Sequence, residues 1–272
     1  MMTDKEKIIN LFYSNVKGKK PNIKTSNINH DGKYGHWLEL QFGLKANDVN
    51  EPDLLGYELK SDTKAVTSFG DWSANMYIFN NEKYKKIFQG QTNLKRRDKF
   101  LTIFGMKNIS KLSRFSWSGL SCPKINHFNS FGQKLLICEN KDIIVVYSFS
   151  KDMRVEKEQI VPRELQQEDL ILAIWYGEKF PANYKFKYNE KTLKNKVEDK
   201  FNKQGWFTCK KNSEGEYTKI CFGPPIDYNL WLEKVKLGIV YFDSGMHTGN
   251  SRPYQQWRAK NEFWDSMINE EY

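Results

Sequence analysis

The sequence lacks any apolar run long enough to cross a membrane. A transmembrane helix needs about 20 consecutive apolar residues, and no stretch of the 272 residues approaches that length. The first residues, Met-Met-Thr-Asp-Lys-Glu-Lys, also lack the apolar core of a secretion signal. The sequence therefore indicates neither a membrane protein nor a secreted one, and we expect no membrane partner and a cytoplasmic location.

Cysteine is scarce, and its spacing excludes the common metal and redox motifs. The chain has four cysteines, at positions Cys122, Cys138, Cys209 and Cys221. No two of them have the C-x-x-C spacing of a zinc site or a thiol redox motif. We expect four reduced thiols without a catalytic role.

The chain also lacks internal repeats, low-complexity tracts and a linker rich in Pro, Gly or Ser. Its composition, 39% apolar and 28% charged residues, is that of a folded protein. We therefore expect a single compact domain over residues 1–272. With no coiled-coil pattern and no exposed apolar helix, a monomer is favoured, although a dimer is not excluded.

What the sequence does have is an excess of positive charge. Lys and Arg number 43 against 33 Asp and Glu, which gives a formal net charge of +10. Such an excess favours polyanionic partners, because each phosphate that a Lys or Arg neutralises releases condensed counterions. Basic groups lie at residues 83–86, 95–97, 107–114 and 185–187.

The apolar periodicity predicts an alternation of helices and strands. A helix is expected at residues 3–16, capped by Thr3 or Asp4, and another at residues 33–44 that stops at Gly43. Strands are expected at residues 55–60, 134–138, 142–149, 206–210, 217–222 and 237–242, the second and third as a hairpin, and helices at 192–202, 228–236 and 254–268. This order predicts an α/β protein with a mixed central sheet flanked by helices.

The strand at residues 55–60 carries a glutamate and a lysine two positions apart. Side chains alternate between the faces of a strand, so Glu58 and Lys60 point to the same side and can converge on one phosphate. Tyr57 and Leu59 then face the core.

Asp53 lies five residues before Glu58, beyond a segment suited to a chain reversal. Pro52 and Gly56 favour a turn that would return the Asp53 carboxylate to the same point as Glu58. Hydrolysis of a phosphodiester needs a metal with hard oxygen ligands, a positioned water and positive charge beside the phosphate. Asp53, Glu58 and Lys60 supply these groups.

Here the sequence resembles a known nuclease family. Residues 35–43 read GHWLELQFG and place Glu39 between two glycines, a polar link follows at residues 45–51, and residues 52–60 read PDLLGYELK. The span from Gly35 to Asp62 is similar to the PD-(D/E)xK nucleases, and most similar to the MutH-like branch that includes the restriction enzymes MvaI and BcnI.

The resemblance implies a restriction-endonuclease-like core. It implies that Asp53 and Glu58 bind Mg²⁺, with Mn²⁺ able to replace it, and that Lys60 orients or polarises the attacking water. Glu39 would support the site from its helix. Within one endonuclease domain, a catalytic lobe would cover about residues 1–150 and a DNA-recognition lobe about residues 151–272.

Sequence-specific contacts must come from other residues, because the cleavage chemistry does not depend on sequence. The segment at residues 242–258 follows an apolar strand, is rich in turn-forming residues, and is similar in kind to a recognition loop of MvaI-like enzymes. Its candidate DNA contacts are His247, Asn250, Arg252, Tyr254, Gln255 and Arg258. The candidate phosphate contacts elsewhere are Lys95, Arg96, Arg97 and Arg114.

We therefore expect a metal-dependent type II restriction endonuclease. It would cut double-stranded DNA at a short specific sequence, leave 5′-phosphate ends, and be accompanied by a cognate DNA methyltransferase. Two alternatives remain at this point: a MutH-like repair endonuclease that nicks one strand, and a DNA-binding module without catalytic activity.

Overall fold

The computed structural model describes residues 2–21, 33–44, 50–63, 65–185, 187 and 189–272. Residues 45–49 of the link before the predicted site, and residue 186 in the basic group at 185–187, lie outside them. The chain forms two compact units. Unit 1 comprises Met1–Thr67, Lys196–Trp231 and Ala259–Tyr272, and unit 2 comprises Ser68–Asn195 and Leu232–Arg258. The units interleave along the chain, and each contains residues from both sides of residue 150.

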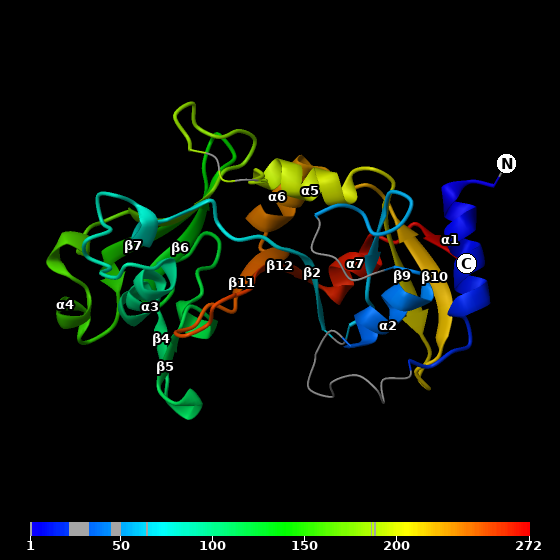
Figure 1. The fold of residues 1–272 in the computed structure, drawn as a ribbon, viewed down its shortest axis with the longest axis horizontal. Helices are drawn as coiled ribbons and strands as arrows, with labels where there is room; N and C mark the ends of the chain where they lie inside the picture. The colour runs from blue at the N-terminus through cyan, green and yellow to red at the C-terminus, as the bar shows by residue number, and fades with distance from the viewer. Residues whose placement is uncertain (1, 22–32, 45–49, 64, 186, 188) are drawn as a thin grey trace. The chain divides into compact units, whose positions relative to one another are not determined.

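The elements of each unit are shown in Figure 1. Unit 1 contains α1 (Asp4–Asn15), α2 (Lys33–Gln41), β1 (Tyr57–Lys60), β9 (Gly205–Lys211), β10 (Tyr217–Gly223), α7 (Asn261–Ser266) and β13 (Glu270–Glu271). Unit 2 contains β3 (Met76–Tyr77), α3 (Asn93–Phe104), β4 (Met106–Asn108), β5 (Arg114–Ser116), β6 (Phe131–Ile137), β7 (Ile143–Asp152), α4 (Lys157–Ile160), β8 (Leu170–Trp175) and β11 (Val240–Ser244), with 3₁₀ turns at Ile78–Asn80, Ile109–Lys111, Gly119–Ser121 and Arg163–Leu165. The chain passes between units within β2 (Val66–Asp71), α5 (Leu193–Phe201), α6 (Tyr228–Lys236) and β12 (Gln255–Lys260).

The sheet of unit 1 has the strand order β1-β9-β10-β13. Strand β1 runs parallel to β9, and β9 pairs antiparallel with β10, so the sheet is mixed, as the sequence predicted. The register sets Glu58 beside Trp206 and Lys60 beside Thr208.

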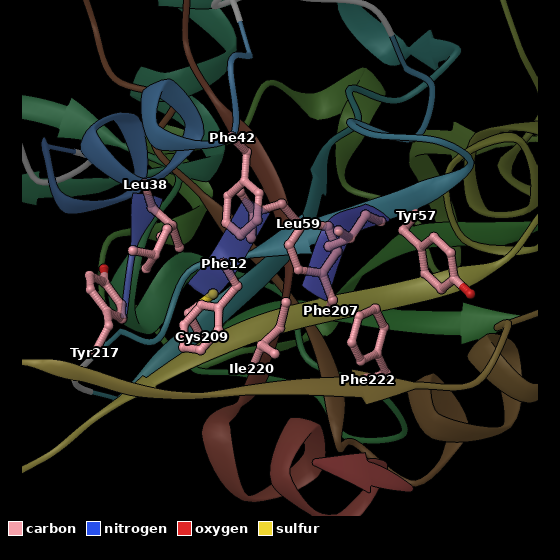
Figure 2. Packing of buried hydrophobic residues seen from close by; sticks show 12 residues of the cluster. Phe12, Leu38, Phe42, Tyr57, Leu59, Phe207, Cys209, Tyr217, Ile220 and Phe222 are labelled. Carbon is pink, nitrogen blue, oxygen red and sulfur yellow. The ribbon is translucent and has the colours of Figure 1, made fainter. Parts of the chain in front are cut away.

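Helices α1 and α2 pack on one face of this sheet. Thr3 and Glu6 form the capping box that starts α1, and Gly43, with φ +74°, follows the end of α2. Figure 2 shows the resulting apolar cluster, which includes Tyr57 and Leu59 from β1. Its other members come from both helices and the residues directly after them, and from β9 and β10: Ile8, Phe12, Val16, Leu38, Phe42, Phe207, Cys209, Tyr217, Ile220 and Phe222. The predicted inward orientation of Tyr57 and Leu59 is confirmed.

The largest sheet of unit 2 has the order β3-β8-β7-β6, with antiparallel pairs. The predicted hairpin between β6 and β7 is confirmed, and Lys141 takes the left-handed conformation in its turn (φ 65°). Within this unit, helix α3 makes aromatic contacts, Phe100 on Trp117 and Phe104 on Tyr147. The Trp117 indole donates to the Gln133 side chain at 2.6 Å, which satisfies the buried N–H.

One predicted element is wrong. The helix expected at residues 254–268 is the strand β12 followed by the short helix α7. Burial alternates along β12, with Gln255, Trp257 and Ala259 inside, which is the period of two of a strand. Trp257 and Trp264 are both buried, as expected, but they belong to different elements.

All four cysteines are free thiols, and three of them are buried. Over the described parts of the chain, every helix is too short or too polar to cross a bilayer.

Candidate active site

A two-residue turn places Asp53 beside strand β1. Leu54 and Tyr57 exchange backbone hydrogen bonds of 3.0 and 2.8 Å. Between them, Leu55 (φ 51°) and Gly56 (φ 84°) both have positive φ, as a type I′ turn requires. The reversal lets the Asp53 Oδ2 accept a hydrogen bond of 2.9 Å from the backbone N–H of Leu59. The predicted chain reversal is confirmed.

Glu58 and Lys60 lie on the face of β1 opposite the apolar cluster. Both are almost completely buried, with exposed fractions of 2% and 7%. The Lys60 Nζ donates to Glu58 Oε1 at 2.8 Å. A second ammonium, Nζ of Lys200 from α5, lies 3.1 Å from the same oxygen. One oxygen of Glu58 therefore faces two cations.

Aromatic rings enclose the Lys60 side chain. Its Nζ lies 4.9 Å from the ring centroid of Phe201 and 5.8 Å from that of Trp264, and Trp264 packs edge-on against Trp206 of β9. This burial lowers the pKa of Lys60, although the Glu58 carboxylate opposes the shift. The ammonium is held in place by packing as well as by its ion pair.

The pKa of the Asp53 carboxyl is shifted in the opposite direction to that of Lys60. Burial, and then the negative charge of Glu58, raise its pKa to about 6, while the hydrogen bond from Leu59 and the lysine charges act against the shift. Loss of water and the negative charge of Glu58 therefore favour the protonated form of Asp53.

The arrangement of Asp53 and Glu58 fits a divalent cation. Glu58 Oε2 is buried and has no hydrogen-bond partner in the described structure, and an orphaned buried acceptor of this kind is costly. Within those same residues, no group of three or more His, Cys, Asp or Glu side chains could hold a metal ion. A pair of carboxylates is nevertheless what Mg²⁺ commonly takes from a protein, since water and substrate phosphate complete its coordination.

Glu39, predicted to support the site, lies on α2 as expected. Its carboxylate is partly exposed and pairs with Nδ1 of His36 at 3.6 Å. Among the described residues it makes no hydrogen bond to Asp53, Glu58 or Lys60. Its supporting role stays a prediction.

Four of the predicted DNA contacts line one pocket in unit 2. The pocket has a volume of about 240 Å³ and brings Arg114 of β5 together with His247, Asn250 and Tyr254. Arg114 is separated from the other three residues by more than 130 positions in sequence. Lys111 and Asp243, which the sequence did not single out as separate candidates, line the same pocket.

The remaining predicted contacts differ in accessibility. Arg97 and Gln255 are buried, with Arg97 donating to the Asn250 carbonyl and Gln255 accepting from the Tyr77 hydroxyl at 2.7 Å. Lys95 and Arg252 are exposed. The other two are engaged within unit 2: Arg96 donates to Asn80, and Arg258 pairs with Asp243 at 3.1 Å.

Sequence reasoning missed Lys200. It was one basic residue in a basic helix, and nothing in the linear pattern distinguished it from its neighbours. Its proximity to Glu58 depends on the parallel pairing of β9 with β1, a contact between segments almost 150 residues apart. Such a pairing has no local signal.

Comparison with known proteins identifies the family of this chain. A family model described as LlaMI restriction endonuclease matches residues 16–272. The chain is 52% identical over 269 residues to the type II restriction enzyme ScrFI of Lactococcus lactis subsp. cremoris, covering 98% of each sequence. Its fold is similar to that of the restriction endonuclease MvaI in complex with cognate DNA, with a TM-score of 0.58 at 11% identity, covering 100% of this chain and 99% of that one. The chain belongs to the LlaMI restriction endonuclease family, and the protein is therefore a type II restriction endonuclease.

Proposed function

We propose that Asp53, Glu58 and Lys60 form the cleavage centre of this enzyme and that it depends on Mg²⁺, with Mn²⁺ as a substitute. The observation that carries the proposal is a buried Glu58 that pairs with Lys60, has an Oε2 without a partner in the described structure, and lies close enough to raise the pKa of Asp53. Asp53 and Glu58 would hold the cation. When bound, it supplies a Lewis acid beside the scissile phosphate.

The lysines of the site provide hydrogen bonds and charge. Lys60, fixed by Glu58 and by the aromatic rings, orients the water that attacks phosphorus. Lys200 adds a second positive charge where negative charge develops on the phosphate oxygens. The water adds to phosphorus as the P–O3′ bond breaks, and the O3′ atom takes up a proton. The products carry a 5′-phosphate and a 3′-hydroxyl. Glu39 is a supporting residue in this proposal.

Unit 2 is proposed to read the DNA sequence. Its pocket supplies Arg114, His247, Asn250 and Tyr254, and the exposed Arg252 lies in the same loop. Lys95 and Arg96 are the proposed phosphate contacts. Arg258 would position the carboxylate of Asp243, with which it forms an ion pair. The proposed set leaves out Arg97 and Gln255, since both are hydrogen-bonded inside the unit.

The proposed location and partners of the enzyme follow from its membership of a restriction endonuclease family. We propose that the enzyme works in the cytosol, with the DNA that it cuts, and that a cognate methyltransferase protects the host sites. A monomer remains the favoured state. MvaI in the similar structure is in complex with its cognate DNA, which supports double-stranded DNA as the substrate here.

The test is cleavage of phage DNA by the purified protein with Mg²⁺ and no other protein. Discrete fragments are expected. Asp53→Ala and Lys60→Ala should lose cleavage by several orders of magnitude while specific binding in Ca²⁺ survives. Glu214→Ala, which removes an exposed carboxylate far along the chain, is the matched control and should cut normally.

Two outcomes would contradict the proposal. Normal cutting by Asp53→Ala would move the cleavage centre elsewhere. Clean nicking of one strand, confined to hemimethylated sites, would instead support the repair activity that the sequence alone left open.

A further inference from the structure

The β4–β5 hairpin of unit 2 ends in exposed apolar residues. Ile109 and Leu112 have exposed fractions of 82% and 101%, and Figure 1 shows the hairpin projecting from its own unit. Leu112 and the next residue, Ser113, both have positive φ, at 54° and 55°. This conformation is unfavourable for residues other than glycine. A leucine that is exposed to water in a strained turn does not stabilise the fold, which points to a role of the tip in binding.

The charge around the tip favours DNA as the partner. Lys107, Lys111 and Arg114 flank the apolar residues, and residues 105–118 contain no Asp or Glu. An apolar tip between cations is suited to a polyanion that also offers an apolar interior. A DNA duplex is such a partner, with phosphates outside and stacked bases inside. The inference thus rests on the proposed DNA-cleaving function.

The pocket described above opens beside this tip. Lys111 directly precedes Leu112 and lines the pocket, as does Arg114. The Arg114 Nε is buried and has no hydrogen-bond partner in the described structure. On another wall the Tyr254 ring lies so close to Gly245 that a Cβ there would sit 2.3 Å from it. Glycine at this position lets the aromatic ring form the pocket wall.

The pocket walls are fixed by hydrogen bonds within unit 2. Thr248 and Trp117 donate backbone hydrogen bonds to Phe115 and Met246, at 2.9 and 2.8 Å, and so tie the recognition loop to β5. The backbone N–H of Gly249 donates to Asp98 on α3 at 3.2 Å. The pocket is therefore formed before any ligand enters.

A recessed pocket is poorly suited to reading bases inside a duplex. Base edges lie at the floor of a groove, so their readers must project from the protein surface. A concave polar site with an aromatic wall can instead receive a base that has left the stack, reading its edge and stacking on its face. Its volume, about 240 Å³, is below the roughly 300 Å³ at which pockets for drug-sized ligands begin, which fits a single base.

We propose that Leu112 and Ile109 enter the base stack of the bound DNA and that one extrahelical base occupies this pocket. The base stacks on Tyr254, while Arg114 and Asn250 donate hydrogen bonds to its edge and Asp243 accepts one. The apolar tip fills part of the space that the base vacates. The β4–β5 hairpin is then a wedge that deforms the DNA, and the pocket stabilises the deformed state.

The experiment uses 2-aminopurine, whose fluorescence rises when it leaves the stack. After the recognition sequence is mapped from the cleavage fragments, the probe is placed at each position of a cognate duplex in turn, with Ca²⁺ to prevent cleavage. Wild-type enzyme should raise the fluorescence severalfold at one position. Leu112→Ala should abolish this rise and weaken cognate binding by roughly tenfold.

Two further variants separate the wedge from the pocket. Ser118→Leu fills the pocket, which Ser118 lines, and should remove the fluorescence rise in a protein whose thermal unfolding is unchanged. Val155→Ala removes another apolar side chain that is 95% exposed, on a different turn, and should leave both readouts as in the wild type.

The outcomes distinguish this proposal from the function on which it rests. If the wild type cuts discrete sites and no probe position brightens, the base stays stacked, the extrusion proposal is overturned and the cleavage function stands. Leu112→Ala binding with wild-type affinity would also overturn it. If the wild type neither binds nor cuts DNA, both proposals fall together.

Discussion

Asp53 makes the stability of the metal-free enzyme depend on pH. Its pKa in the folded protein is raised to about 6 by burial and by Glu58, whereas an unfolded aspartate titrates near 3.9. A raised acid pKa means that the folded state prefers the protonated form. The group's stabilising contribution is therefore complete below about pH 4 and is lost as the pH rises through about 6. A cation bound by the carboxylates would relieve this penalty.

Asp53→Asn should therefore stabilise the metal-free protein at alkaline pH. In EDTA at about pH 8, the free energy of unfolding measured with urea should be higher for Asp53→Asn than for the wild type by on the order of 1 kcal/mol, a value discounted because the carboxyl is partly exposed. This difference should shrink by about pH 5. Added Mg²⁺ should stabilise the wild type more than the variant. Glu214→Gln, an exposed carboxylate, is the control. A difference independent of pH would contradict the explanation.

Lys200 offers a second test at the scale of single residues. Its ammonium lies 3.1 Å from Glu58 Oε1 and repels a cation bound by that carboxylate. Lys200→Gln should lower the Mg²⁺ concentration needed for half-maximal cleavage. At saturating Mg²⁺, cleavage should still be slower by about 10²-fold, because positive charge beside the phosphate is lost.

The measurement is the single-turnover rate as a function of Mg²⁺ concentration. Lys203→Gln, an exposed lysine just beyond the same helix, is the matched control and should change neither quantity. A purely structural role for Lys200 predicts a lower rate without any change in Mg²⁺ dependence.

At the scale of elements, the Asp53 turn is built from a residue that suits it poorly. Leu55 adopts φ 51° and is exposed, although type I′ turns favour Asn-Gly. Leu55→Asn should raise the free energy of unfolding by about 0.5 kcal/mol and leave the cleavage rate unchanged. Gly56→Ala should destabilise the protein, since its Cβ would lie 2.9 Å from Gln204 Cγ at a positive φ. Urea unfolding and a cleavage assay of both variants check this, and a destabilising Leu55→Asn would contradict it.

Local patterns account for the elements that the sequence predicted well. The Thr3 cap, the Gly43 stop and the alternation through Glu58 and Lys60 are signals carried by neighbouring residues, and each has the expected structure. The positions of Asp53, Glu58 and Lys60 around β1 were predictable to the same extent, because the three lie within eight residues of sequence, whereas their catalytic role stays a prediction.

The sequence-based predictions failed where contacts between distant segments determine the structure. The apolar residues near Trp257 and Trp264 fit a helix, yet residues up to Lys260 pair in a sheet that also contains β2, which is distant in sequence. Lys200 and the Arg114 pocket likewise join segments that are far apart along the chain. A single sequence carries no local signal that predicts which distant segments are in contact.

At the scale of the whole molecule, the formal charge of +10 combines two kinds of cation. Lys95 is exposed at the start of α3, where it can contact a phosphate without regard to sequence. Arg114 lines a pocket of unit 2, where we propose that it contacts one base. Phosphate contacts add affinity for any DNA and make it salt-dependent, whereas base contacts add affinity for one sequence.

These two kinds of cation should separate in a salt titration. Between about 50 and 200 mM salt, Lys95→Gln should weaken binding to cognate and noncognate duplexes alike and reduce the slope of log K against log salt by about one. Arg114→Gln should weaken the binding free energy by about 1–3 kcal/mol on cognate DNA and by much less on noncognate DNA, and should leave the slope nearly unchanged.

The measurement is fluorescence anisotropy in Ca²⁺, with Asp53→Ala as the control, because a residue of the cleavage centre should alter neither the slope nor the preference. An equal loss on both duplexes for Arg114→Gln would make it a phosphate contact, and the pocket would then no longer account for sequence preference.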